Sequence, residues 1–175
     1  MKNIYITLTF IALIACFSPN DKTATANILP RSGSSVTGEV VFTERKGIVS
    51  VEANIFGVGA GPVAVHIHTI GDCSSDDGKS SGGHWNPTEE NHGKWGVAPF
   101  HSGDIGNIKI DDRGKGKISI TDKSGRWSIG GSPETDIIGK AIVVHVGMDD
   151  MASQPTGAAG ARIGCGVIKK RFTKN

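Results

Sequence analysis

The segment V-S-V-E-A-N-I, residues 49–55, alternates apolar and polar side chains at each successive position. Because neighbouring side chains of a β-strand point to opposite faces, this period of two predicts a strand with one buried face. Comparable segments predict further strands at 36–43, 62–68, 106–111, 116–121 and 140–146. Helix-type periodicity is scarce, so the sequence predicts an all-β protein.

The connections between these segments support the same fold class. Glycine makes up 25 of the 175 residues, and its share is about twice the usual ~7%, as expected for short strands joined by many turns. The run D-R-G-K-G at 112–116 predicts a hairpin turn, because glycine permits the positive φ that such turns require. A chain of this length forms one domain of ordinary size.

The N-terminus predicts export. Lys2 precedes an apolar run at 4–14 that is too short to span a bilayer and is typical of a signal peptide. The run ends in L-I-A-C at 13–16, which resembles the bacterial lipobox, where the cysteine is lipidated and becomes the new N-terminus. We therefore expect Cys16 to carry lipid and to attach a periplasmic protein to a membrane.

This interpretation divides the chain into a signal peptide at 1–15, a flexible tether at 16–35 and a folded domain at 36–175. Two alternatives remain open at this point. The run A-T-A at 24–26 is a competing cleavage site, and Cys16 would then be an ordinary cysteine of a signal peptide.

Export gives a role to the other two cysteines, Cys73 and Cys165. Disulfides persist in an oxidising compartment, so these two residues are expected to pair. Closing so long a loop would contribute on the order of 4 to 5 kcal/mol to stability. The alternative is a pair of free buried thiols.

The chemistry of the chain lies in its six histidines. His66 and His68 share one face of the predicted strand 62–68, and His145 lies at the end of another apolar strand. An H-x-H pair or a strand-end histidine is a weak signal by itself, but together the three imidazoles predict a metal site. A site of this kind that stays open to solvent suits copper.

A second group of candidate ligands lies in residues 69–105, a stretch rich in Gly, Ser, Asp and Pro without a clear strand. Loops of this length are uncommon in compact domains unless they are functional or disordered. The loop supplies four candidate ligands: His84, His92, His101 and Asp104. Three imidazoles and a carboxylate form a saturated tetrahedral set, as expected for structural zinc, and the metal would order the loop.

Charge excludes one class of partner. The formal net charge is +2, and the chain has no long basic run and no basic patch interleaved with aromatic residues. These features give no electrostatic footprint for nucleic acid.

Taken together, these motifs resemble the copper/zinc superoxide dismutase family, and its exported bacterial branch in particular, from about residue 36 to 168. The motifs are H-I-H-x-x-G-D-C at 66–73, G-G-H-W-N-P at 82–87, H-G at 92–93, H-S-G-D-I-G-N at 101–107, V-V-H at 143–145 and G-A-R-I-G-C-G-V-I at 160–168. The chain departs from the family pattern at Thr69, where glutamate is usual, and in the short segment from Asp149 to Arg162. Neither departure removes a ligand.

The resemblance implies two ligand sets that share one residue. The copper ligands would be His66, His68, His84 and His145, and the zinc ligands His84, His92, His101 and Asp104. His84 would bridge the two ions as an imidazolate, which two nearby dications make accessible. It would release copper and take up a proton on reduction.

The resemblance also implies roles for two residues that bind no metal. Asp149 matches a carboxylate that links a copper-bound and a zinc-bound imidazole, here His66 and His92. Arg162 matches the arginine beside copper that attracts the anionic substrate, and the disulfide at Cys165 would hold it in position.

The fold implied by the resemblance is a flattened eight-stranded Greek-key β-barrel of the immunoglobulin-like sandwich kind, with long metal-binding and electrostatic loops. The implied activity is dismutation of superoxide to oxygen and hydrogen peroxide, which would protect the cell envelope. The alternative is a non-catalytic periplasmic lipoprotein that buffers or delivers copper and zinc. A zinc hydrolase is disfavoured, because the zinc set would have no open position. The sequence leaves open whether the protein forms a homodimer.

Overall fold

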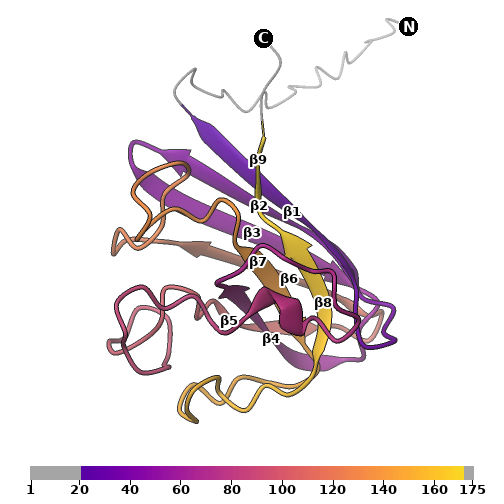
Figure 1. Cartoon of the computed structure of the whole chain (residues 1–175). Coiled ribbons are helices and arrows are strands. Elements are labelled where there is room, and N and C mark those ends of the chain that lie inside the picture. Colours follow the sequence, from indigo (N-terminus) through magenta and orange to yellow (C-terminus); the bar gives the residue numbers. More distant parts are fainter. Residues whose placement is uncertain (1–20, 172–175) are drawn as a thin grey trace, which may run out of the picture.

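The computed structural model describes residues 21–171, which form antiparallel strands and one short 3-10 helix (Figure 1). The elements in chain order are β1 (Lys22–Pro30), β2 (Thr37–Arg45), β3 (Ile48–Phe56), β4 (Gly61–His68), η1 (Lys79–Ser81), β5 (Gly106–Ile110), β6 (Lys115–Thr121), β7 (Ala141–His145), β8 (Arg162–Val167) and β9 (Lys169–Arg171). No helix within this range is long and apolar enough to cross a membrane.

The strands close into a barrel. Their order is β2-β3-β6-β5-β4-β7-β8-β1-β9, and β1 also pairs with β2, so eight strands form a ring and β9 extends it beside β1. The neighbours β3–β6 and β4–β7 are not consecutive in the chain, as in a Greek key. The all-β class and the eight-stranded Greek-key barrel are therefore confirmed.

The alternating segment at 49–55 lies inside β3, where its apolar members face the barrel interior. Val49, Val51, Ala53 and Ile55 are each at most 1% exposed. The other five predicted segments lie within or overlap β2, β4, β5, β6 and β7. The predicted hairpin is present between β5 and β6, where the Asp111 N–H donates to the Lys115 carbonyl at 2.8 Å and Gly114 has φ 73°.

The predicted flexible tether at 16–35 is wrong for residues 22–30, which form β1. This strand pairs with β2 over seven positions, from Lys22↔Glu44 to Ile28↔Gly38. Two of its three buried side chains are small, Ala24 and Ala26, and only Ile28 is large, which weakens the apolar period that would mark a strand. The A-T-A run at 24–26 lies within β1, so cleavage there would remove part of the core. Residues 1–20, which include the predicted signal peptide and Cys16, lie outside the described residues.

Strand β8 was also not predicted as a strand, because it carries two glycines, which are depleted in strands. The structure gives the reason for one of them. A Cβ on Gly166 would lie 2.4 Å from the Asn27 carbonyl oxygen, so glycine is required for β1 and β8 to approach. This packing closes the barrel.

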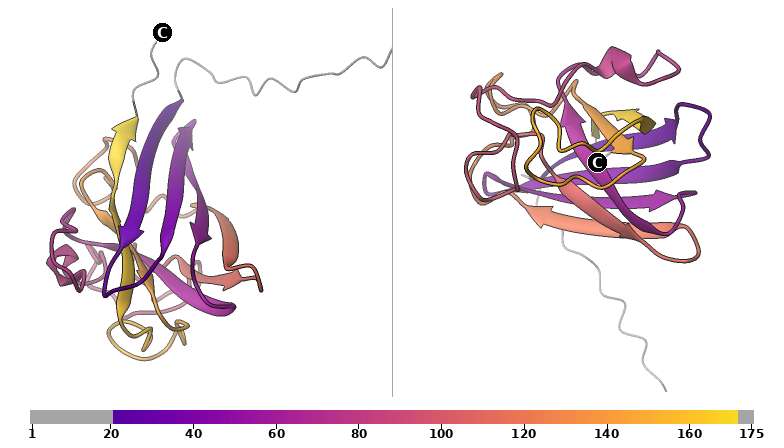
Figure 2. Two further views of the ribbon diagram at one scale, coloured as in Figure 1. Left: turned by 90° about the vertical axis from the view of Figure 1, so that its right-hand side faces the viewer. Right: turned by 90° about the horizontal axis from the view of Figure 1, so that it is seen from below.

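The barrel has an inner core and a smaller outer cluster. Ile67, Ile142 and Val144 belong to the main core, whereas Val143 and Cys165 form part of the outer cluster against Cys73. The segment that follows β4 thus packs through Cys73 against the outer faces of β7 and β8. The connection 146–161 lies at the end of the barrel opposite the one where β1 begins and β9 ends (Figure 2).

Candidate metal centre

Three histidines project from the barrel strands toward one place. His66 and His68 lie on the outer face of β4, since the intervening Ile67 points into the core. His145 lies at the end of the neighbouring β7, after a bulge between Val144 and His145. The ring centroids of His66 and His145 are 5.0 Å apart, so rigid strands bring these side chains together.

The loop at 69–105 folds back onto β4 and supplies the other candidate ligands. The Trp85 N–H donates to the Ile67 carbonyl at 2.8 Å, and the Gly103 N–H donates to the Trp85 carbonyl at 2.9 Å. These bonds place His84 beside His68 and bring His101 and Asp104 next to them. The expected absence of strands from this loop is confirmed, and η1 is its one helical turn within the described residues.

The seven side chains form two groups of four that share one member. In each group the candidate ligand atoms lie within 4.8 Å of one another. The groups are His66, His68, His84 and His145, and His84, His92, His101 and Asp104. His84 belongs to both, and all seven side chains are buried.

Hydrogen bonds determine which ring nitrogen of each histidine faces its group. His68 Nδ1 donates to the Gly82 carbonyl at 2.8 Å, and His145 Nδ1 donates to the Gly160 carbonyl at 3.1 Å. A carbonyl can only accept, so the proton lies on Nδ1 and Nε2 keeps its lone pair. The opposite tautomer holds for His101, whose Nε2 donates to the Glu90 carbonyl at 3.0 Å.

Asp149 connects the two groups. Its Oδ2 accepts from His66 Nε2 and its Oδ1 accepts from His92 Nε2, both at 2.9 Å. Its backbone is fixed in turn by Asn107, which accepts from the Asp149 N–H and donates to its carbonyl, both at 2.8 Å. Asp149 is 2% exposed, so it is a buried carboxylate with both oxygens in use.

The remaining ring nitrogens provide a direct test of whether metal fits here. Six histidine nitrogens are buried without a hydrogen-bond partner: His66 Nδ1, His68 Nε2, His84 Nε2, His92 Nδ1, His101 Nδ1 and His145 Nε2. Buried polar atoms are rarely left unpaired in proteins. Lone pairs directed into a common space are the donors that copper and zinc take, so both groups fit a metal ion.

The protonation of the first group also favours metal. Burial lowers the pKa of His68 to about 2, of His145 to about 3 and of His84 to about 4, and neighbouring histidines add to the effect. These imidazoles are therefore neutral at physiological pH, as metal ligands must be.

The second group contains one cation and one strong acid. Burial opposes protonation of His92, but the carboxylates of Asp104 and Asp149 outweigh it and raise its pKa to about 9. Burial alone would raise the pKa of Asp104, but its close contacts with the imidazoles of His101, His84 and His92 hold that pKa well below its usual range. Three histidine Nδ1 atoms surround Asp104 Oδ1 at 2.8 to 3.2 Å, although only that of His84 has hydrogen-bond geometry.

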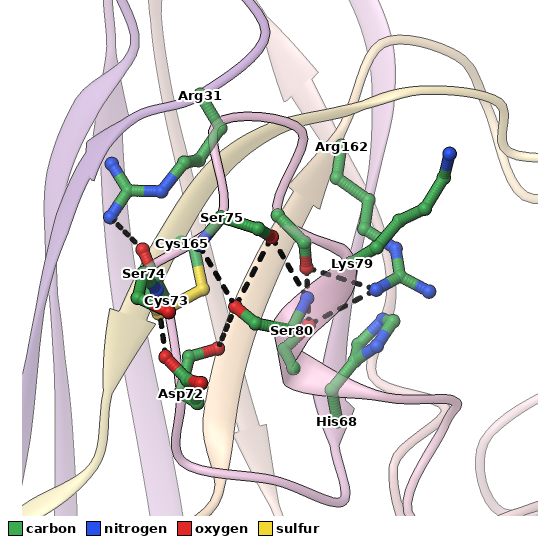
Figure 3. Close-up of a disulfide and its surroundings, with 12 residues drawn as sticks. Arg31, His68, Asp72, Cys73, Ser74, Ser75, Lys79, Ser80, Arg162 and Cys165 are labelled. Atoms are coloured by element: carbon green, nitrogen blue, oxygen red, sulfur yellow. Dashed lines mark hydrogen bonds between the residues drawn. A yellow bond between two sulfur atoms is a disulfide. The ribbon is translucent and has the colours of Figure 1, made fainter.

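Arg162 lies beside the first group. Its Nη1 donates to the Gly78 carbonyl at 3.0 Å and to Ser81 Oγ at 3.2 Å, which places the guanidinium next to the His68 ring (Figure 3). Its positive charge contributes to the lowered pKa of both His68 and His145. The site is therefore electropositive on this side.

The predicted disulfide between Cys73 and Cys165 is present, across a sequence separation of 92 residues, and the free-thiol alternative is wrong. It ties the loop to β8 three residues beyond Arg162. The Arg31 guanidinium donates to the Cys73 carbonyl on the side of the disulfide that faces away from Arg162 (Figure 3). The segment that contacts Arg162 is thus fastened covalently to the barrel.

An antiparallel barrel that carries two histidine-rich groups of metal ligands is the architecture of a two-metal protein. Comparisons with known proteins identify its family. The family model of copper/zinc superoxide dismutase matches residues 36–168. "Superoxide dismutase [Cu-Zn] 1" of Aquifex aeolicus (strain VF5) is 33% identical over 154 residues, covering 82% of this chain and 86% of the relative. The crystal structure of the clock protein EA4 has a TM-score of 0.74 at 32% identity, covering 89% of this chain and 99% of that one.

The chain belongs to the copper/zinc superoxide dismutase family. It is an oxidoreductase that acts on superoxide, and its cofactors are copper and zinc.

Several residues that hold the ligands in place belong to no motif of the sequence. Asn107 fixes the backbone of Asp149, and Gln154 pairs with both the N–H and the carbonyl of His92 at 2.8 and 2.9 Å. Glu90 accepts from the Phe100 N–H and from the His101 ring, and Arg126 donates to the Phe100 carbonyl. Polar residues in loops carry no periodic signal, so only the structure connects them to the site.

Proposed function

We propose that copper binds the group on the strands and zinc binds the group in the loop. The copper ligands are then His66, His68, His84 and His145, and the zinc ligands are His84, His92, His101 and Asp104. The observation that carries this assignment is that His84 belongs to both groups. Its Nδ1 lies 2.8 Å from Asp104, and its Nε2 is among the unpartnered nitrogens.

The choice of metal for each group rests on ligand type. A carboxylate with three imidazoles is a saturated tetrahedral set, as in structural zinc sites. Four imidazoles without a carboxylate suit copper, which supplies one-electron redox chemistry when bound. Two superoxide ions and two protons then yield one molecule of oxygen and one of hydrogen peroxide.

The chain's own residues contribute position and charge to this reaction. Arg162 supplies a fixed positive charge that attracts the anionic substrate. His84 can hold a proton at Nε2 whenever that atom does not ligate. Asp149 fixes the orientation of His66 and His92 together, so that the two groups keep their relative geometry.

We also propose that the protein works in the periplasm as a lipoprotein and protects the cell envelope from superoxide. The support is the signal-like run at 4–14 followed by the lipobox-like L-I-A-C at 13–16. The start of β1 at Lys22 adds a constraint. Six residue steps separate Cys16 from Lys22, which limits the distance from lipid to barrel to at most ~22 Å.

Metal titration tests the assignment. The metal-free protein receives one equivalent of zinc and then one of Cu(II), and the electron paramagnetic resonance spectrum is recorded. We expect a single copper signal with nitrogen ligation that disappears in His68→Ala, while bound zinc remains. Copper that retains its signal in this variant would contradict the assignment.

Membrane attachment has its own test. Wild-type protein and Cys16→Ala are expressed in the same bacterial host, and membranes are separated from periplasmic contents. We expect wild type in the membrane fraction, with lipid on Cys16 detectable by mass spectrometry, and the variant outside it. Identical distribution of the two proteins would disprove the lipid anchor.

A further inference from the structure

Arg126 lies in the connection between β6 and β7, far in sequence from the loop that contains the zinc ligands, yet it reaches that loop. Its Nη2 donates to both carboxylate oxygens of Glu90, at 3.0 and 2.8 Å. Its Nη1 donates to the Phe100 carbonyl at 2.9 Å, and the guanidinium carbon lies 4.0 Å from the centre of the Phe100 ring. Nη1 also donates to Thr88 Oγ1 at 3.5 Å, so one side chain contacts three residues of the loop.

Glu90 completes the connection on the loop side. Its Oε2 accepts from the Phe100 N–H at 3.2 Å, and its main-chain carbonyl accepts from His101 Nε2 at 3.0 Å. Asn86 donates to the same carbonyl at 2.8 Å and accepts from the Glu90 N–H at 3.1 Å. The Glu90 side chain therefore holds the residue before His101, while its backbone holds the ring of His101.

The consequence for His101 is a fixed tautomer and a fixed direction. Donation from Nε2 leaves the lone pair on Nδ1, and Nδ1 lies 3.2 Å from Asp104 Oδ1. Ligand rings oriented by such partners bind metal more tightly, and loss of the partner typically costs 10- to 100-fold in affinity. The Arg126 and Glu90 side chains are only 16% and 29% exposed, so water screens this pair less than a surface pair.

We propose that the ion pair between Arg126 and Glu90 is a positioning device that pre-forms the zinc group by orienting His101. This inference rests on the proposed zinc assignment. It adds a residue from the β6–β7 connection that touches no ligand directly, and it makes zinc affinity depend on Arg126.

A purely structural role would give a different result. Trp127 Nε1 donates to the Ser102 carbonyl at 2.7 Å, so the β6–β7 connection has a second link to the loop that does not involve Arg126. If the ion pair only added stability, it would be equally strong with and without zinc. Its loss would then lower the melting temperature of the metal-free protein and leave the zinc affinity of the folded protein unchanged.

The experiment compares wild-type protein with Arg126→Lys, Glu90→Gln and the double variant in the full mature chain. Arg113→Lys is the matched control, because Arg113 lies in the exposed β5–β6 turn, where its side chain pairs with Asp111 of the same turn. Zinc affinity is measured by competition with a chelator. Co(II) alone serves as a spectroscopic probe of the same group, and the metal-free melting temperature is recorded for each protein.

We expect the three variants to bind zinc about 10- to 100-fold more weakly than wild type and to show altered Co(II) visible bands. The double variant should be no weaker than the worse single variant, because both changes break one pair. The control should match wild type. Zinc affinity within about twofold of wild type with unchanged Co(II) bands would overturn the proposal, even if the melting temperature fell.

His101→Ala separates this outcome from failure of the zinc assignment. Loss of Co(II) binding in His101→Ala with normal binding in the Arg126 and Glu90 variants would overturn only the positioning role. Wild-type Co(II) bands in His101→Ala would overturn both the assignment and the positioning role.

Discussion

Arg162 stands directly opposite His145 in the register of β8 and β7. Its guanidinium is held by the Gly78 carbonyl and Ser81 Oγ, both in the loop segment that follows Cys73. The sheet and the disulfide-tied loop therefore fix a positive charge beside the proposed copper ligands. Burial lowers the pKa of Arg162, but an arginine stays charged at physiological pH.

Arg162→Ala should slow superoxide removal by about tenfold, because a fixed charge in a cleft raises the encounter rate with anions. The dependence of the rate on ionic strength should weaken as well, since screening would have less attraction to remove. Copper content should not change. Arg113→Ala, which removes an exposed arginine from the β5–β6 turn, is the control, and a rate like that of the control would exclude the guiding role.

His145→Ala should lose copper and dismutation while keeping zinc. His145 belongs only to the first group of four, and its Nε2 is one of the unpartnered buried nitrogens. Metal content by mass spectrometry and activity on the same sample give the result. Simultaneous loss of zinc would show that the two groups have been divided wrongly.

Asp149→Asn should weaken binding of both metals by about 10- to 100-fold, because an amide cannot accept from both His66 and His92. The amide nitrogen would face one of these ring N–H groups and force a change of tautomer or position. Competition with a chelator measures each affinity. Asp150→Asn is the matched control, since the exposed Asp150 carboxylate accepts from Ala152 and Ser153 of its own turn. An effect on one metal alone would contradict a shared role for Asp149.

Replacing Cys73 and Cys165 by serine should lower the free energy of unfolding by about 4 kcal/mol, given the long loop that the bridge closes. The effect is measured by denaturant unfolding of the metal-free protein, so that zinc does not compensate. Activity per bound copper should also fall, because Gly78 and Ser81 would no longer hold Arg162 rigidly. A change below about 1 kcal/mol would mean that hydrogen bonds alone keep the loop in place.

Zinc uptake should release a proton near neutral pH. The pKa of His92 is raised to about 9 in the metal-free protein, so at pH 7.5 this ring is protonated, and zinc must displace the proton from Nδ1. The release should fade as pH rises through about 9. The raised pKa also means that protonated His92 stabilises the folded metal-free protein. This contribution to the free energy of unfolding is complete below a pH of about 6.5 and is lost as the pH rises through about 9. Calorimetry in two buffers of different ionisation enthalpy measures the proton count, and zero release at pH 7.5 would contradict the prediction.

The fold could be predicted from the sequence wherever apolar and polar side chains alternate along a strand. The segment at 49–55 is a strand because large apolar residues alternate with polar ones, and β3 has that pattern of burial. Strand β1 has Ala24 and Ala26 inside with threonines next to them, and Ile28 is its one large buried side chain, so its period is faint and its sequence resembles a tether. Strand β8 needs Gly166 for close approach to β1, and glycine argues against a strand in a sequence.

The metal ligands could be predicted where residues that commonly bind metals occur at spacings that bring them together in the fold. His66 and His68 share a face by strand geometry, and the structure places them together with His84 and His145. The supporting partners could not be found in this way. The backbone carbonyl of Glu90 accepts from the His101 ring, and the side-chain amide of Gln154 bonds to the backbone of His92. Neither contact follows a spacing or a residue type that marks a partner of a metal ligand in a sequence.

Superoxide removal gives the most direct test of copper-dependent dismutation at this site. The rate is measured for the mature chain loaded with one copper and one zinc. It is compared with the rate of the zinc-only form and with that of His145→Ala treated in the same way. We expect fast removal by the copper- and zinc-loaded wild type alone. A fully loaded wild type that is no faster than free copper would contradict this expectation, and would instead indicate a metal-binding protein built on the dismutase fold.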